Sequence, residues 1–514
     1  MARCPTLVIA GTCSGSGKTS LALAIARALV RRGLRVQTFK VGPDFLDPTY
    51  LALASGRPCY NLDGWMSGRE YLERLFERAV ADADLAIVEG VMGLFDGADP
   101  ETDEGSTAEI ARRLDAPILL VVNVHGMARS LAALVKGFSI FEPDLCFTGV
   151  VANHCGSERH AAWLADSLKA AGLPPLLGAL PRGAFPGLAS RHLGLVTADS
   201  ERLPEAVLDA LAETVERHVP LEWLFPGLRL KPLPPGRVPF SQGESDGGDN
   251  PGKEWATPKG LGESPTASPQ PGDCQLDLFS EWEEAKAPAV LPPAPQYSPA
   301  VRLRLGVARD AAFHFYYQDL FDALAAAGCE IVFFSPLAEE RLPEGLSGLV
   351  IGGGYPEVHA AALSANAGML SAIRAYAASG RPLYAECGGL MYLSEGIESD
   401  GRFHPLLGIL PVRTQMLARK KTLGYVEVTL REDSLWGPRG TILRGHEFHY
   451  SEMVGDPSAY GAWRRIYDLR RRRSEGSEAE GFQKGAILAS YTHLHHASQP
   501  GSIDFFLRIC GGRP

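Results

Sequence analysis

The sequence lacks three features that mark membrane-spanning, nucleic-acid-binding and disulfide-stabilised proteins. It has no stretch of about 18 uncharged apolar residues, so no segment is predicted to cross a membrane. Basic residues number 50 against 60 acidic ones, whereas a nucleic-acid-binding protein would show a clustered basic excess. The 9 cysteines are scattered and form no C-x-x-C pair, which argues against a disulfide framework or a zinc ribbon. We therefore expect a cytoplasmic protein that binds neither membranes nor nucleic acid.

Two regions of the chain alternate short apolar runs with amphipathic stretches. In the first region a helix is expected over Lys18 to Arg32, directly after an apolar run. Apolar strands that alternate with helices are typical of a parallel sheet covered on both faces, so the pattern predicts two α/β domains. The runs predicted to be strands are Leu7–Ala10, Leu85–Val88, Ile118–Val122, Thr148–Ala152, Leu303–Ala308, Glu330–Phe334, Gly348–Ile351 and Pro382–Ala385.

A segment of different composition separates the two regions. Residues 231–300 contain 14 of the 38 prolines and 8 of the 56 glycines. Such a composition buries too little apolar surface to offset the entropy of ordering the chain, which predicts a disordered linker. The predicted organisation is a domain over residues 1–228, a linker over 229–300 and a second domain over 301–514.

One apolar pentapeptide, Gln275–Phe279, lies within the predicted linker. It resembles the short peptides by which bacterial proteins dock on the DNA-polymerase sliding clamp. A local patch that docks on a neighbouring domain, or no role at all, is the more common explanation for such a peptide.

The sequence leaves the oligomeric state open, with a homodimer among the options.

A glycine-rich loop after the first expected strand is typical of a phosphate-binding site. Residues 11–19 read Gly-Thr-Cys-Ser-Gly-Ser-Gly-Lys-Thr. Glycines such as Gly15 and Gly17 let backbone amides wrap phosphate oxygens, and the helix that follows adds its positive dipole. Lys18 is predicted to reach the β- and γ-phosphates of ATP, and Thr19 to bind Mg²⁺. A threonine holds the place of the usual first glycine, and this longer loop resembles that of the dethiobiotin-synthetase branch of P-loop proteins.

Acidic residues follow two of the expected strands, where they could complete a Mg²⁺ site. Asp44 and Asp47 come after one strand, and Glu89 and Asp96 come after another. The carboxyl ends of parallel strands face the crevice in which open α/β sheets bind ligands, and Mg²⁺ prefers hard oxygen ligands. A solvated loop acid is the alternative for each residue singly, but the group beside a phosphate loop favours a metal site.

A cysteine in the second region stands in the local context of a nucleophile. Cys387 lies between an expected strand and helix, and the two glycines after it permit the tight turn of a nucleophile elbow. Gly354, in a second glycine-rich turn, and Gly388 are predicted to supply the backbone amides of an oxyanion hole. His493, near the C-terminus, is the candidate base. Together these features outweigh the usual fate of a lone cysteine, which is structural burial.

The remaining histidines leave alternatives open. His495 and His496 follow His493 closely, and a metal site is one interpretation, but no cysteine or acid in the neighbouring sequence completes a ligand set. His446 and His449 lack the i,i+4 spacing of a helical zinc-protease pair. They either line a substrate pocket or pack structurally.

These motifs together resemble the cobyrinate a,c-diamide synthase family of glutamine-dependent amidotransferases over residues 5–225 and 301–505. The stretches that carry the resemblance are KVGPDFLDP from Lys40, NLDGW from Asn61, EGVMGLFDG from Glu89, RHLGL from Arg191, ARDAAFHFYYQ from Ala308, GGGYPE from Gly352 and AECGGL from Ala385. The first two stretches distinguish this family from its sister, cobyric acid synthase. The resemblance implies an α/β protein in which an N-terminal P-loop parallel-sheet domain, similar to dethiobiotin synthetase, is joined by the linker to a class I glutamine amidotransferase-like domain.

The resemblance also implies an activity and assigns residues to it. Cys387, activated by His493, would form a glutamyl thioester and release ammonia. ATP would phosphorylate the a- and c-acetates of cobyrinate, and channelled ammonia would displace phosphate to give cobyrinate a,c-diamide in cobalamin biosynthesis. The residues assigned to ATP–Mg²⁺ are Lys18, Thr19, Asp44 and Glu89, and those assigned to the substrate and the acyl phosphate are Asp47 and Asp96.

One departure from the class I amidotransferases concerns the catalytic triad. Their third member is an acid two residues after the histidine, and that position is His495 in this chain. The sequence therefore leaves open which group orients His493, or whether His493 works with Cys387 as a dyad.

Alternative functions remain at this stage. The same chemistry on hydrogenobyrinate or nickel-sirohydrochlorin, or that of cobyric acid synthase, would use the same motifs, because these residues do not settle the ring or its metal. A non-enzymatic alternative is a P-loop switch ATPase with an inactive amidotransferase domain. The intact Cys387-Gly-Gly context and His493 argue against that alternative.

Overall fold

The computed structural model describes residues 4–185, 204–225, 303–419, 422–472, 474 and 476–512, and these residues form two compact units. The first unit holds residues 4–62, 76–185 and 204–225, and the second holds 63–75 and the residues from 303 onwards. The predicted linker, its pentapeptide Gln275–Phe279 and the Arg191 stretch lie outside the described residues. The domain limits 1–228 and 301–514 therefore stay a prediction. None of the described helices combines the length and the apolar composition needed to cross a bilayer.

The first unit is built on a seven-stranded sheet in which every pair of neighbouring strands is parallel. Its order is β3 (Tyr60–Leu62), β2 (Val36–Val41), β4 (Leu85–Glu89), β1 (Thr6–Gly11), β5 (Ile118–Asn123), β6 (Phe147–Cys155) and β7 (Leu176–Pro181). The central strands are buried along nearly their whole length, which explains why the sequence shows them as continuous apolar runs rather than alternating ones.

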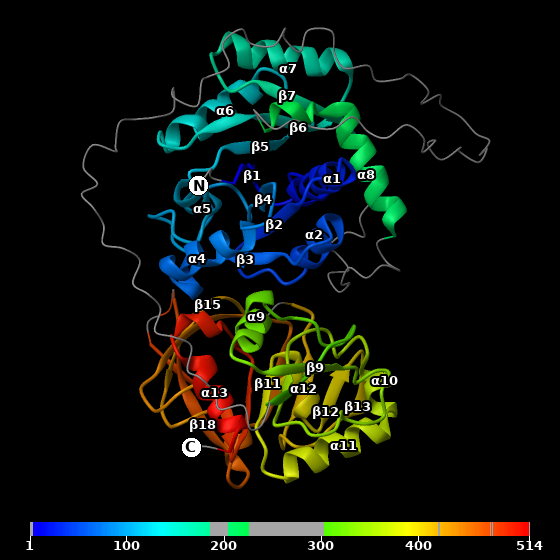
Figure 1. Cartoon of the computed structure of the whole chain (residues 1–514), viewed down its shortest axis with the longest axis vertical. Helices are drawn as coiled ribbons and strands as arrows, with labels where there is room; N and C mark the ends of the chain where they lie inside the picture. The colour runs from blue at the N-terminus through cyan, green and yellow to red at the C-terminus, as the bar shows by residue number, and fades with distance from the viewer. Residues whose placement is uncertain are drawn as a thin grey trace, which may run out of the picture. The chain divides into compact units, whose positions relative to one another are not determined.

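Helices cover both faces of this sheet (Figure 1). The faces alternate along each strand: Leu119 and Val121 pack in one core, and Leu120 and Val122 pack in the other. The first core also contains α1 (Lys18–Arg31), α2 (Asp47–Ser55) and α8 (Glu205–His218), and the second contains α6 (Ser130–Phe141) and α7 (Glu158–Ala170). Helix α5 (Thr107–Leu114) follows the loop that leaves β4. The carboxyl ends of β1, β2 and β4 therefore share one edge, as the acids after them require.

The second unit contains a ten-stranded mixed sheet. Its parallel part comprises β20 (Ile487–Ser490), β11 (Leu383–Glu386), β10 (Gly348–Ile351), β8 (Arg304–Ala308) and β9 (Glu330–Phe334), in that order. An antiparallel part continues from β20 through β19 (Glu478–Lys484), β18 (Arg464–Arg471), β15 (Thr422–Leu430), β16 (Ile442–His449) and β21 (His493–Leu494). The unit also contains a separate four-stranded sheet, whose order is β13 (Arg402–Pro405), β12 (Gly396–Ser399), β14 (Arg413–Met416) and β17 (Ser451–Val454). Helices of this unit are α9 (Gln318–Ala326), α10 (Ala360–Ala365), α11 (Ala367–Ala378), α12 (Gly388–Leu393) and α13 (Ser502–Cys510).

The second unit also includes a segment from the N-terminal half of the chain. Residues 63–75 contain α3 (Gly64–Ser67) and the start of α4 (Arg69–Val80). The Trp65 ring lies 4.8 Å from that of Tyr425, whose hydroxyl donates to Asp63 at 2.7 Å. Arg444 donates to the Trp65 carbonyl at 3.3 Å. These contacts explain why the segment groups with residues that follow it by hundreds of positions.

The α/β fold class and the predicted strands are confirmed, with small shifts at their ends. Strands β9 and β10 have the predicted limits, whereas β11 begins one residue later than predicted and includes Glu386. The antiparallel half of the second sheet had no counterpart among the predicted strands. Its strands mix buried residues with partly buried and exposed ones, a pattern that is weaker in the sequence than a continuous apolar run.

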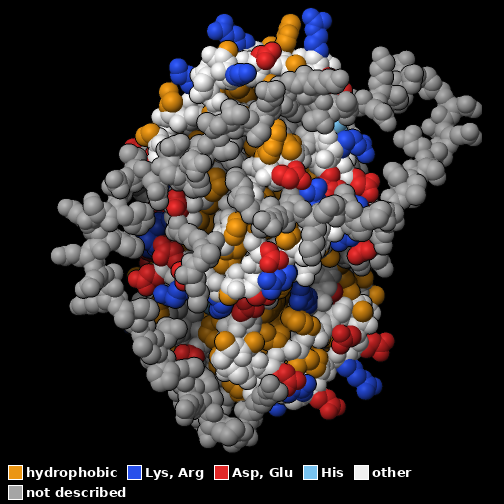
Figure 2. All heavy atoms as spheres, turned by 45° about the horizontal axis from the view of Figure 1, so that its top comes forward, with side chains coloured by type: hydrophobic (Ala, Val, Ile, Leu, Met, Phe, Trp, Pro, Cys, Tyr) orange, Lys and Arg blue, Asp and Glu red, His pale blue; other side chains and the backbone are white. Residues whose placement is uncertain are grey.

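Charges of both signs lie close together on the described surface (Figure 2). Arg57 pairs with Asp82 at 2.6 Å and Arg35 with Asp84 at 2.9 Å. Exposed pairs of this kind contribute little to stability, so the burial described above carries the fold.

Candidate functional site: a phosphate loop and a cysteine nucleophile

The phosphate loop lies between β1 and α1, as predicted. Gly15 and Gly17 both have positive φ angles, 77° and 103°, which residues with side chains rarely adopt. A Cβ atom on Gly17 would also collide with the amide of Asn153, which donates to the Ser16 carbonyl at 3.0 Å. Lys18 is buried and donates to the carbonyls of Cys13 at 3.1 Å and Met92 at 2.5 Å. Asn153 thus fixes the backbone of the phosphate loop, and Lys18 connects this loop with the loop that follows β4.

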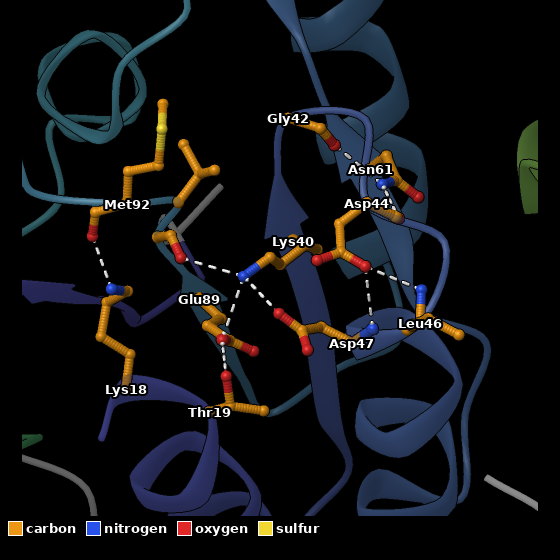
Figure 3. A network of polar contacts seen from close by, with 12 residues as sticks. Lys18, Thr19, Lys40, Gly42, Asp44, Leu46, Asp47, Asn61, Glu89 and Met92 are labelled. Carbon is orange, nitrogen blue, oxygen red and sulfur yellow. Dashed lines mark hydrogen bonds and ion pairs between the residues drawn. The ribbon is translucent and has the colours of Figure 1, made fainter. Parts of the chain in front are cut away.

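A second lysine, Lys40, lies at the centre of the polar network beside this loop (Figure 3). Its ammonium group is 2.8 Å from Asp47 and 3.0 Å from Glu89, and it also donates to the Gly90 carbonyl at 3.0 Å. The Thr19 hydroxyl donates to the same oxygen of Glu89, at 2.5 Å. Three of the acids and hydroxyls predicted from the sequence therefore meet around a residue that the sequence assigned to no role.

Burial controls the ionisation of this network. Burial alone would lower the pKa of Lys40, but Asp47, Glu89 and Asp44 together raise it above the ordinary lysine value. Desolvation raises the pKa of Glu89 to about 7, although Lys40 favours its ionised form. Desolvation and then the neighbouring Asp47 raise the pKa of Asp44. One permanent positive charge therefore faces carboxylates that hold their protons more tightly than usual.

The other two predicted acids occupy different positions. Asp44 accepts from the amides of Leu46 and Asp47 at 2.7 and 3.1 Å, and so orders the turn that leads into α2. The Asn61 side chain donates to the Gly42 and Asp44 carbonyls, both at 2.8 Å, and holds this turn against β3. Asp96 is exposed on the loop after β4, where it accepts from the Gly93 amide at 2.8 Å.

The donor set around Glu89 fits a magnesium ion. Its Oε1 takes the bonds from Thr19 and Lys40, whereas its Oε2 is buried and has no hydrogen-bond partner among the described residues. A buried carboxylate oxygen beside a threonine hydroxyl is the kind of hard ligand that Mg²⁺ takes in nucleotide sites.

In the second unit, Cys387 forms the predicted elbow between β11 and α12. Its φ of 48° and ψ of −101° are unusual for a residue with a side chain, at a cost of about 1–3 kcal/mol. The residue is 5% exposed, and its sulfur lies 3.9 Å from the Phe448 carbonyl. Strain at this position and a sulfur at the start of a helix are the features of a nucleophile elbow.

The structure brings His493 to Cys387. Burial alone would lower the pKa of His493, but the neighbouring Cys387 and Glu386 outweigh burial and raise it to about 10. The imidazole Nδ1 lies 3.7 Å from the nearer carboxylate oxygen of Glu386. The protonated imidazolium is therefore the favoured state of His493 at neutral pH.

The two predicted oxyanion-hole glycines lie next to each other. Gly354 has a φ of 155°, and a Cβ atom there would collide with the Ala312 carbonyl. A Cβ atom on Gly388 would stand 3.0 Å from the Gly354 nitrogen, so the two backbone amides belong to one small region beside the cysteine. Neither position tolerates a side chain.

His495 and His496 meet an acid that the neighbouring sequence lacks. Strand β21 ends at Leu494, so His495 and His496 lie beyond it; their rings stack at 5.1 Å and both face Asp319 of α9. Ligand atoms of these three residues lie within 4.8 Å of one another. The Tyr71 hydroxyl donates to Asp319 at 2.7 Å and lies 3.1 Å from His496 Nε2, so hydrogen bonds already connect the cluster. Although burial opposes its ionisation, His495 and His496 hold the pKa of Asp319 below its ordinary value.

We expect the Tyr71→Phe substitution to weaken this attachment of residues 63–75. A hydrogen bond to a buried charged group contributes about 1.5–3 kcal/mol, so the free energy of unfolding should fall by about that amount. Urea unfolding followed by fluorescence measures it, with Tyr460→Phe as the control because that side chain is 56% exposed. Equal stability of the two variants would contradict the assigned bond.

Sequence reasoning missed two residues of these sites, and each had a signal. Lys40 stands between Phe39 and Val41 in a strand that is buried throughout, where an unpaired lysine would be very costly, so a lysine in this strand was a signal for acidic partners. Glu386 precedes the nucleophile directly, but its approach to His493 depends on the pairing of distant strands. His446, left open between pocket and packing, stacks on His493 at 5.0 Å.

Comparisons with known proteins identify a known family for each half of the chain. The chain matches a family model described as the CobQ/CobB/MinD/ParA nucleotide binding domain over residues 7–194, and one described as the CobB/CobQ-like glutamine amidotransferase domain over residues 304–501.

Curated relatives match nearly end to end. The cobyrinate a,c-diamide synthase of Syntrophotalea carbinolica is 51% identical, with 99% of each chain covered. That of Leptospira interrogans is 39% identical, with 98% of each chain covered. The hydrogenobyrinate a,c-diamide synthase of Streptomyces coelicolor is 41% identical over 98% of this chain and 97% of its own. The chain therefore belongs to the a,c-diamide synthase family of glutamine-dependent ligases, as its motifs predicted.

Proposed function

We propose that this protein amidates the a- and c-acetate carboxylates of cobyrinate, with ATP and glutamine as co-substrates. The observation that carries the proposal is the presence, in one chain, of a phosphate loop beside buried acids and a strained cysteine paired with a histidine of raised pKa. The family supports the substrate class, because the relatives described above are named for cobyrinate and hydrogenobyrinate. We expect the reaction to take place in the cytoplasm.

The phosphate loop and its acids would form and hold an acyl phosphate. The amides of Gly15 and Gly17 and the ammonium of Lys18 would bind the ATP phosphates. A magnesium ion held by Thr19, Glu89 and Asp44 would supply charge neutralisation of the transferred phosphoryl group. Phosphorylation converts a carboxylate, which has no good leaving group, into an acyl phosphate, a mixed anhydride from which ammonia can displace phosphate.

Asp47 and Asp96 would act on the substrate side of this site. Asp47 is fixed by its ion pair with Lys40, so its position is set before any substrate binds. Asp96 is exposed and free to meet a substrate from solution. We assign both to positioning of the corrinoid and its acyl phosphate.

The cysteine site would generate the ammonia. The Cys387 thiolate attacks the side-chain carbonyl of glutamine, and the developing oxyanion is stabilised by the amides of Gly354 and Gly388. His493 gives its proton to the departing nitrogen, and ammonia leaves a glutamyl thioester behind. Water then hydrolyses the thioester to glutamate, with His493 as the base. The ammonia displaces phosphate from the acyl phosphate to form the amide.

A substrate panel tests the proposal. The protein is incubated with ATP, Mg²⁺, glutamine and one of four acceptors: cobyrinate, hydrogenobyrinate, nickel-sirohydrochlorin or cobyrinate a,c-diamide. Mass spectrometry then gives the number of amidations from the product mass. We expect two amidations of cobyrinate. Hydrogenobyrinate is the second candidate, because a relative named for it is 41% identical to this chain. Amidation of cobyrinate a,c-diamide but not of cobyrinate would refute the proposal.

A further inference from the structure

Glu386 connects the strand of the nucleophile with the strand of the base. It is the last residue of β11, where it pairs in register with Ser490 of β20, and Cys387 follows it directly. One carboxylate oxygen, Oε1, accepts from the Tyr384 hydroxyl at 2.5 Å and from the Leu494 amide at 3.0 Å. Leu494 is the neighbour of His493 in β21. Two donors therefore fix the orientation of this carboxylate.

The second oxygen of the same carboxylate faces the histidine. Glu386 Oε2 lies 3.7 Å from His493 Nδ1, and the two side chains are 13% and 1% exposed. With Nδ1 turned to the carboxylate, Nε2 is the ring nitrogen left for Cys387. Catalytic hydrogen bonds are often long before a substrate binds, and 3.7 Å is within reach of a small side-chain adjustment.

The other titratable groups around His493 are occupied differently. His446 stacks on His493, and burial, followed by the two histidines His493 and His495, holds its pKa well below the ordinary value, so it is neutral. Glu447 forms a 2.7 Å ion pair with Arg471. His495 faces Asp319. Cys387 and Glu386 are the two side chains that raise the pKa of His493 against the effect of burial.

We infer that Glu386 is the positioning carboxylate of the glutaminase site and takes the place of the acid that other class I amidotransferases carry two residues after the histidine. The inference rests on the proposed roles of Cys387 and His493. The position of Glu386 suits this role. Because Glu386 ends a central strand directly before the nucleophile, the backbone that forms the elbow also fixes the carboxylate. Glu386 touches neither glutamine nor the reacting sulfur in this role. It holds the imidazole in the tautomer and orientation that present Nε2 to Cys387.

The Glu386→Gln substitution tests the inference, because glutamine keeps an acceptor for Tyr384 and Leu494 while it removes the charge. Glutamate release from glutamine is measured, together with ammonia-dependent amidation. We expect the kcat for glutamate release to fall by about 10²-fold, less than the ~10⁴-fold loss when a directly bonded aspartate is replaced in a triad. KM for glutamine and the ammonia-dependent rate should change little.

The pH profile separates positioning from a merely structural role. His493 must be protonated to release ammonia, so kcat/KM should fall as the pH rises through its pKa of about 10. Removal of the Glu386 charge destabilises the imidazolium, so this alkaline limb should move down by about one pH unit in Glu386→Gln. Glu386→Asp, which keeps the charge, should leave the limb near its original position and restore at least part of kcat.

Glu480→Gln is the matched control. Glu480 is a buried carboxylate of β19, the strand on the other side of β20 from β11, and it accepts from the Ser490 hydroxyl at 2.6 Å and the Tyr491 amide at 2.9 Å. The same chemical change there should leave the alkaline limb in place. The inference is overturned by an unmoved limb in Glu386→Gln, by an equal shift in Glu480→Gln, or by Glu386→Asp behaving like Glu386→Gln. If Glu386→Gln does not fold, the pH profile of Glu386→Asp decides. This variant keeps the charge, so an alkaline limb that falls to the ordinary pKa of histidine would overturn the inferred role of the charge.

The outcomes also separate this inference from the proposed function. Glutamate release does not require the corrinoid, so a wrong acceptor substrate would leave the comparison intact. Loss of glutamate release with a normal ammonia-dependent rate places the defect in the glutaminase site.

Discussion

The Cys387→Ser protein should lose at least about 10³-fold in glutamine-dependent amidation and keep its ammonia-dependent amidation within about twofold. A serine hydroxyl is a much poorer nucleophile than a cysteine sulfur, so the substitution removes the group that attacks glutamine. Burial lowers the pKa of His493, and Cys387 is the largest of the influences that raise it. The variant thus loses both the nucleophile and the protonated histidine that releases ammonia.

Product mass with glutamine or ammonium chloride as the nitrogen source measures the two activities side by side. Cys329→Ser is the matched control, because Cys329 is a buried thiol of the same unit that lies outside the site. Full use of glutamine by Cys387→Ser would show that the nucleophile is misassigned. Loss of both activities would instead point to a folding defect.

The Lys40→Met protein should be inactive with either nitrogen source and less stable by about 3–5 kcal/mol. Lys40 is 2% exposed and faces Asp47 at 2.8 Å and Glu89 at 3.0 Å, so its removal leaves two carboxylates buried without a counter-charge. They must then take up protons or shift toward water. Either response spoils the ligands that we assign to the metal and the substrate.

Urea unfolding and the amidation assay measure the two effects of Lys40→Met. Lys136→Met is the control, because Lys136 is exposed on α6. The double variant Lys40→Met/Glu89→Gln should recover part of the stability, since it removes charges of both signs. A Lys40→Met protein within 1 kcal/mol of the parent would contradict the role of Lys40 as the counter-charge.

The sites were predictable from the sequence to the extent that their chemistry resides in consecutive residues. The phosphate loop depends on backbone conformation. Gly15 and Gly17, which adopt its positive φ angles, are close to Lys18 in the sequence. The elbow at Cys387 is equally local, since strand, cysteine and glycines follow one another. Both candidate sites could therefore be proposed before any contact was known. The continuous apolar strands between them were predictable for the same reason.

Only the tertiary structure decided which charged side chains surround the phosphate loop and the elbow at Cys387. Whether Lys40 meets Asp47 and Glu89, and whether Glu386 reaches His493, depends on which strands lie side by side. The acid beside His495 and His496 comes from α9, far away in the sequence. Backbone conformation is encoded over a few residues, whereas the pKa of a buried group is set by every charge within several ångströms, and only the tertiary structure brings those charges together. By itself, the sequence determined the two kinds of chemistry, and the packing of distant strands decided which side chains tune them.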